Sequence, residues 1–199
     1  MRTDWQSPHE IPPVRVLRVT LRGPVTLGHV LFLDELGSPV VNGEPISLGD
    51  LSLAVLVCSM TEQEARKALL SRFSGILTHW WGRRCAKLDF NEQADRFNAW
   101  FTEQCGGPTI DRAEDADREP KPLTSPWFIS KLASAMAYLH LSMEDAKAMP
   151  VKRLNQLLGA YAETQGNVSF VTPEIDRANA IIEEAEKRWL ERLGKGESK

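Results

Sequence analysis

The chain has 199 residues, a pI near 5.9 and a formal net charge of −3 at pH 7, and its length fits one domain or two small ones. With 42% hydrophobic and 26% charged residues, the composition is near that of an average globular protein and suggests neither wholesale disorder nor a membrane protein. The slight negative charge gives no general attraction for a polyanion, so a nucleic-acid partner is not favoured.

The first element expected is a short strand near the N-terminus. Residues 14–21 are rich in β-branched side chains that partly alternate with polar ones, which is typical of a strand. A lone strand leaves its backbone groups unpaired, so this one must pair with a hairpin partner, a symmetry mate or another protein. The N-terminus is therefore a candidate docking segment.

Helix signals follow. Thr26 is placed to cap a helix that Gly37 ends, and a small hairpin is expected over residues 40–46 because Asn-Gly is a turn signal. Ser47 and Thr61 each have an acidic residue three positions later, and this capping arrangement starts two further helices.

The rest of the first half is expected to be helical up to a linker. Residues 48–58 are apolar almost all round and are expected to form the central buried helix. Asn91 is expected to cap another helix, which ends before Gly106-Gly107-Pro108. Residues 106–125 combine prolines and glycines with a run of charges, a composition typical of a solvated acidic linker or long loop.

Four helices are expected in the second half. The first starts at Ser125-Pro126, runs to Leu141 and has a broad apolar face. A short helix from Ser142 ends at Met149-Pro150, and a third runs from Pro150 to a stop at Gly166. The last is expected over 174–193, with an apolar stripe on one side and charges opposite.

These elements predict a mainly α fold. We expect two small helical lobes, residues 1–105 and 126–199, with a short strand or hairpin near the N-terminus and the linker 106–125 between them. The longest apolar run, residues 51–58, is too short to span a bilayer, and the first residues lack the apolar core of a secretory signal. Three irregularly spaced cysteines are typical of reduced thiols, so we expect a cytoplasmic protein without disulfides.

Residues that carry chemistry are scattered along the chain. The histidines form no His-x-x-x-His pair, no two cysteines form a Cys-x-x-Cys unit, and no glycine-rich phosphate loop is present; the histidines are His9, His29, His79 and His140. We therefore expect no catalytic centre, no metal and no cofactor. Among the thiols, Cys58 is expected to be buried and inert, and Cys105 is the more exposed candidate nucleophile.

Two clusters are candidate partner-binding sites. Trp80 and Trp81 lie beside Arg83, Arg84 and Lys87, and such interleaving of aromatic and cationic residues suits contact with single-stranded nucleic acid or phosphate. Packing of the tryptophans in the first core is the alternative interpretation, and the overall acidity of the chain favours it.

The second cluster is the apolar stripe of the last expected helix, which includes Ile182 and Trp189. This stripe has two interpretations, a face that binds a partner or a second copy of the chain, or packing onto the second core.

Two stretches follow an order of elements found in a known family. Residues 26–31, 36–39 and 46–54 give a short helix, a loop and an apolar Leu-Gly-Asp-Leu helix, and residues 140–150, followed by 157–166, give a helical hairpin that contains Met-Pro. In these respects the chain resembles the tail assembly chaperones encoded in the tail-morphogenesis cassettes of tailed bacteriophages.

This resemblance implies a non-enzymatic, protein-binding function in the cytoplasm of a bacterial host. The partner would be a tape-measure protein, a long helical chain whose apolar surface the chaperone shields until tail-tube subunits replace it. Two other functions stay open: a structural or adaptor component of a phage-like particle, and a nucleic-acid-binding protein that uses the cluster at residues 80–87.

Overall fold

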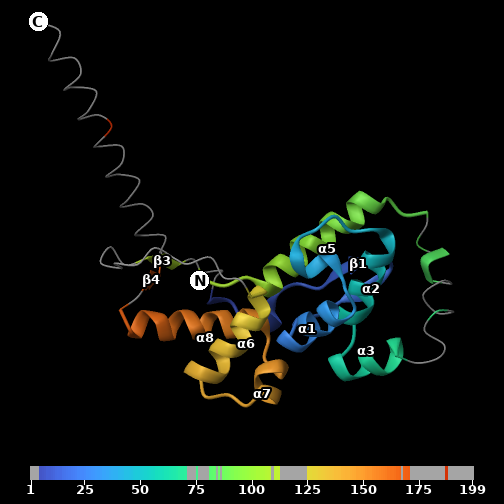
Figure 1. Ribbon diagram of the computed structural model, residues 1–199. Coiled ribbons are helices and arrows are strands. Elements are labelled where there is room, and N and C mark those ends of the chain that lie inside the picture. Colours follow the sequence, from blue (N-terminus) through green and yellow to red (C-terminus); the bar gives the residue numbers. More distant parts are fainter. Residues whose placement is uncertain are drawn as a thin grey trace, which may run out of the picture.

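The computed structural model is mainly helical, with a two-stranded antiparallel sheet near the N-terminus, and it confirms the predicted fold class (Figure 1). The structure describes residues 5–70, 75, 81–83, 85, 87–108, 110–112, 125–166, 168–170 and 187. The helix predicted over 174–193 lies outside this described part, apart from residue 187.

The segment predicted to contain the N-terminal strand forms a two-stranded hairpin, in which its two halves pair with each other. Strand β1 (Val14–Val16) runs antiparallel to β2 (Val19–Leu21), and the turn between them contains Leu17 and Arg18, with φ of 46° and 67°. Two-residue hairpin turns of this hand favour asparagine and glycine. Here the buried Leu17 side chain and a 2.8 Å hydrogen bond from its N–H to the side chain of Gln93 stabilise the turn.

The hairpin predicted over residues 40–46 is wrong, because this stretch begins with a short 3-10 helix, η3 (Pro39–Asn42). Pro39 supplies the fixed φ of a first helical residue, and Gly43 adopts the left-handed conformation that ends the turn, with its N–H bonded to the Pro39 carbonyl. Glycine is equally suited to both turns, so Asn-Gly alone does not distinguish them. Another 3-10 turn, η2 (Pro8–Glu10), lies upstream of the hairpin.

The predicted start signals of three helices are confirmed. Helix α1 (Leu27–Glu35) is capped by Thr26, α2 (Leu48–Cys58) begins at a capping box made by Ser47 with Asp50, and α3 (Glu62–Leu69) begins at one made by Thr61 with Glu64. Helix α2 contributes much of the core, as its apolar sequence predicts; its buried residues are Leu51, Ser52, Ala54, Val55, Val57 and Cys58.

Helix α5 (Phe90–Cys105) starts at Asp89, so the prediction that Asn91 caps it is wrong. The Asp89 carboxylate accepts hydrogen bonds from the backbone N–H groups of Asn91 and Glu92, at 2.9 and 3.3 Å. A carboxylate suits a helix N-terminus because it neutralises the positive end of the helix dipole. Helix α5 packs against the N-terminal hairpin and α2.

Among the described residues of the second half, three helices follow: α6 (Trp127–Tyr138), α7 (Met143–Ala148) and α8 (Val151–Thr164). Helix α6 ends earlier than predicted, because Leu139 closes it and His140 then adopts a left-handed conformation. Beyond α8, strand β4 (Val168–Phe170) pairs antiparallel with β3 (Ile110–Arg112), which lies inside the predicted linker.

The described residues before and after this linker share one buried core. Phe128 of α6 and Leu154 of α8 belong to the same cluster as the buried side chains of α1, α2 and α5. Backbone hydrogen bonds join the halves as well, because the N–H of Val151 bonds to the carbonyl of Val25 and the N–H of Leu27 to that of Met149, at 2.9 and 3.0 Å. Figure 1 shows α6 and α7 beside α1, in agreement with these contacts.

Candidate functional site

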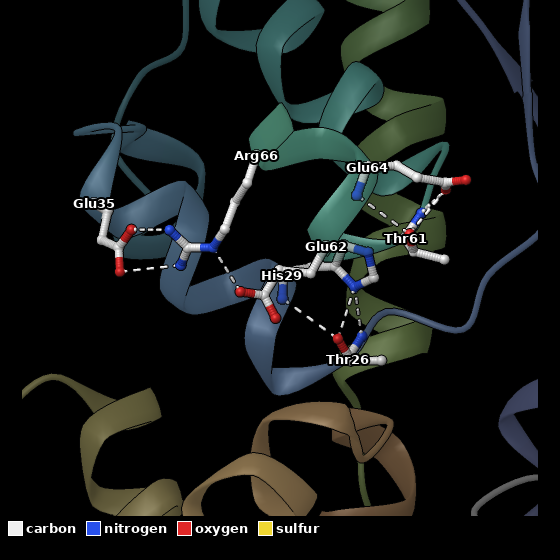
Figure 2. A network of polar contacts seen from close by, with 7 residues as sticks. All are labelled: Thr26, His29, Glu35, Thr61, Glu62, Glu64 and Arg66. Carbon is white, nitrogen blue, oxygen red and sulfur yellow. Dashed lines mark hydrogen bonds and ion pairs between the residues drawn. The ribbon is translucent and has the colours of Figure 1, made fainter. Parts of the chain in front are cut away.

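A polar cluster joins α1 to the start of α3 (Figure 2). Beside it lies a cavity of about 690 Å³, lined in part by Thr26, His29 and Glu62. A histidine with several carboxylates beside a cavity is a common composition for a general acid–base site, so this cluster is the first candidate for catalysis. Its members are Thr26, His29, Glu35, Thr61, Glu62, Glu64 and Arg66.

His29 is buried, and both of its ring nitrogens are engaged in hydrogen bonds. Its Nδ1 lies 3.0 Å from the backbone nitrogen of Thr26 and 2.8 Å from the Thr26 hydroxyl, so Nδ1 must accept. Its Nε2 therefore carries the proton and donates to the carbonyl of Met60 at 2.9 Å. Burial lowers the pKa of His29, against the opposing effects of the Met60 carbonyl and Glu62. The ring is thus a neutral structural group, and a proton transfer through it would break the cap of α1.

The carboxylates of this cluster are also committed to structural contacts. Arg66 donates to Glu35 from both terminal nitrogens, at 2.6 and 3.1 Å, and to Glu62 from Nε at 2.7 Å. The hydrogen bond from Arg66 is the main reason why the pKa of Glu35 is lowered. The Arg66 guanidinium also lies 4.4 Å from the centre of the Phe32 ring. The cluster therefore fastens α3 onto α1 through the contacts of Arg66 with Glu35 and Glu62.

The cysteines do not have the environment of nucleophiles. Cys58 and Cys85 are buried thiols, as expected for Cys58, and Cys105 is half-buried. Burial raises the pKa of the Cys58 thiol and raises that of Cys105 to about 12. The thiolate is the reactive form, and a raised pKa makes it scarce at neutral pH.

The described ranges contain neither a cluster of metal ligands nor a membrane-spanning helix. Between residues 5 and 170, outside the gaps in the description, no three histidine, cysteine or acidic side chains lie close enough to hold a metal ion. In the same part of the chain, no helix has both the length and the apolar character needed to cross a membrane.

The structure places two of the six predicted partner-binding residues. Trp81 is half-buried and packs against the core, whereas Arg83 is exposed, as is the nearby Lys87. For Trp81 alone, this packing agrees with the interpretation as a core residue. The other four predicted residues lie outside the described part of the chain; these are Trp80, Arg84, Ile182 and Trp189.

Sequence reasoning missed an exposed apolar stripe on α6. Ile129 and Met136 lie seven residues apart, and thus on the same side of the helix, and each keeps 40% of its surface exposed. Ala133 between them is exposed too, and Met143, the first residue of α7, is 48% exposed. Apolar side chains gain free energy by leaving water, so a contiguous exposed set marks a candidate interaction surface. We call Ile129, Ala133 and Met136 the α6 stripe.

The sequence does contain a signal for this stripe. The apolar residues of 126–141 cover more of the helix circumference than the single stripe of about 100° that a core contact needs. The broad face was expected to turn inward as a whole, but α6 buries only Phe128 and Ala135 fully.

Comparisons with known proteins give no further identification. No model of a protein family matches the chain, and no curated protein and no solved structure is similar to it.

Proposed function

We propose that this protein is a non-enzymatic, protein-binding module that acts as a tail assembly chaperone, with a helix of a tape-measure-like protein as its partner. The single observation that carries the proposal is the α6 stripe, where two large apolar side chains a heptad apart stay in contact with water. The resemblance of residues 26–31, 36–39, 46–54, 140–150 and 157–166 to tail assembly chaperones supplies the choice of partner.

The stripe suits the recognition of an amphipathic helix. Such helices present apolar side chains at intervals of three, four and seven residues, which is the spacing of Ile129, Ala133 and Met136. Methionine side chains are flexible and polarisable, so they adapt to partners of different shape. These side chains are already partly covered, so each contributes on the order of 1 kcal/mol on binding. A contact of this strength is reversible, as a chaperone that must later be displaced requires.

The geometry of the polar cluster agrees with a non-enzymatic function. Each ionisable group around His29 has a structural partner, and the thiols of Cys58 and Cys105 are held in their unreactive form. The proposal therefore needs no reactive group, only a surface and a stable scaffold behind it.

The test is affinity purification of the tagged protein from its native producing cells, with mass spectrometry of the co-purified chains and light scattering of the complex. Wild type is compared with the double variant Ile129→Ser/Met136→Ser and with Ala137→Ser, a small change at an exposed position that borders the stripe on the same helix. A long helical chain recovered with wild type and Ala137→Ser, but lost with the double variant, supports the proposal. Equal recovery with all three proteins, or a monomer without any partner, contradicts it.

A further inference from the structure

A second surface feature of α6 lies on a different side of the helix from the stripe. Lys131, Ser134 and Tyr138 follow one another at spacings of three and four residues and face α8 across a groove of about 660 Å³. From α8, Asn155 and Tyr161 line the same groove. Helices α6 and α8 lie side by side in Figure 1, and contacts between them hold the groove in place.

Lys131 is a cation without a counterion among the described residues. It is the one charged side chain among the described residues that line the groove, and no acidic residue of the described part forms an ion pair with it. Partial burial of its ammonium group lowers the pKa of Lys131. Removing an ammonium ion from water without an anionic partner is unfavourable. A ligand that brings a negative charge close to Lys131 offsets this cost, so the groove favours anionic ligands.

The other groove residues supply hydroxyl donors and apolar walls. Tyr138 of α6 and Tyr161 of α8 stack with ring centroids 5.3 Å apart and planes 19° from parallel, which fixes two phenol groups in the lining of the groove. The hydroxyl of Ser134 adds a donor beside Lys131 on α6, and Leu158 contributes apolar surface from α8.

We propose that this groove binds the carboxylate side chain of a glutamate or aspartate presented by a partner protein, with Lys131 as its counterion and the hydroxyls of Ser134, Tyr138 and Tyr161 as donors. One lysine balances the single charge of a carboxylate. Phosphate carries more charge and is held by arginines, several cations or the N-terminus of a helix, and the described lining residues provide none of these. The methylene groups of the acidic side chain pack against Leu158.

This proposal rests on the proposed function in one respect: the carboxylate belongs to a protein. It does not require the partner to be a tape-measure protein, and it does not use the α6 stripe. The two proposals can therefore fail separately.

The experiment follows the lysines by NMR after reductive ¹³C-methylation, which keeps their charge. The Lys131 signal is assigned by its loss in Lys131→Arg, and the intact protein is titrated with three probes to about 20 mM, the range of a single weak contact. These are acetyl-Ala-Glu-Ala-amide, the same peptide with glutamine, and inorganic phosphate. We expect the glutamate peptide to shift the Lys131 signal, the glutamine peptide to leave it in place, and phosphate to shift it less.

An unmoved Lys131 signal, an equal response to the glutamine peptide, or a larger response to phosphate would overturn the proposal. Lys131→Met should weaken glutamate-peptide binding, measured on the neighbouring backbone amides, about tenfold. Lys147→Arg, a change on the separate helix α7, should not weaken it. The variant Ile129→Ser/Met136→Ser should bind the peptide like wild type. If the groove fails this test while the stripe still captures a long helical chain, the proposed function stands and the groove proposal falls.

Discussion

His29 donates a hydrogen bond from Nε2 to the carbonyl oxygen of Met60, 2.9 Å away, and so ties the first turn of α1 to the turn between α2 and α3. The bond requires the neutral ring, because Nδ1 simultaneously accepts from the backbone N–H of Thr26. Protonation would place two like-signed N–H groups face to face at Thr26 and a positive charge at the positive end of the helix dipole.

The stability of the protein should therefore depend on pH through His29. Its pKa is lowered from 6.5 in the folded state, so the unfolded chain binds the proton first as the pH falls. The free energy of unfolding should decrease as the pH drops below 6.5 and level off below the folded pKa. Urea unfolding at a series of pH values measures this slope. His29→Gln should flatten it in this window, and an unchanged slope would contradict the assignment.

Arg66 should contribute more to stability than an ordinary surface arginine. It binds Glu35 and Glu62, lies over the Phe32 ring and has a side chain only 30% exposed. After a discount for the exposed Glu35, Arg66→Ala should cost about 1 kcal/mol. Arg96→Ala is the matched control, because it removes an exposed pair with Glu92 and should cost less than about 0.5 kcal/mol. Equal losses in chemical unfolding would contradict the special role of Arg66.

Gly28 should be intolerant of a side chain although it lies in a helix. A Cβ added there would meet the carboxylate of Glu62 and the backbone oxygen of Lys147, so Glu62 would have to leave Arg66. Gly28→Ala should therefore destabilise the fold by roughly 1–2 kcal/mol. Replacement of a glycine inside a helix by alanine usually has the opposite effect and raises stability.

Gly49→Ala is the control for this substitution. It lies in α2, and an added Cβ meets its nearest neighbour at an ordinary 3.5 Å. This variant should be stabilised by about 0.5–1 kcal/mol. Thermal unfolding of both variants checks the contrast, and two shifts in the same direction would refute it.

The thiols should react slowly while the protein is folded. Burial raises the pKa of Cys105 to about 12 and also raises that of Cys58, so little thiolate exists near pH 8. Iodoacetamide labelling followed by mass spectrometry should show alkylation of both cysteines far below the rate for the urea-unfolded chain. Rapid alkylation of Cys105 in the folded protein would contradict this prediction and would again make Cys105 a candidate nucleophile.

Local sequence signals predicted the helices well and the side-chain environments poorly. The pairs Ser47 with Asp50 and Thr61 with Glu64 were readable because both partners lie within one helical turn, where few competing contacts exist. The turn at Leu17 could not be predicted from the local sequence, since its backbone is stabilised by Gln93, far away in the chain. Tertiary contacts of this kind leave no local pattern.

The α6 stripe and the groove at Lys131 could not be predicted from the sequence for the same reason. Periodicity showed that α6 is apolar over a broad arc, but which part of that arc is covered depends on where neighbouring helices pack. That Lys131 faces no acidic side chain among the described groove residues likewise depends on which side chains α8 presents. The residues predicted from composition at 80–84 and 182–189 remain predictions, because the structure describes only Trp81, Arg83 and residues 82 and 187 among them.

Substitution of two consecutive residues of α6 should destabilise the protein by very different amounts, and this contrast separates the stripe from the core. Phe128 is fully buried, and Phe128→Ala should destabilise the fold by about 3–5 kcal/mol through the cavity it leaves. Ile129, 40% exposed, should cost less than about 1.5 kcal/mol when changed to serine, because much of its surface is already in water. Chemical unfolding gives both values. If Ile129→Ser destabilises the protein as strongly as Phe128→Ala, Ile129 belongs to the core, and the surface that supports the proposed function does not exist.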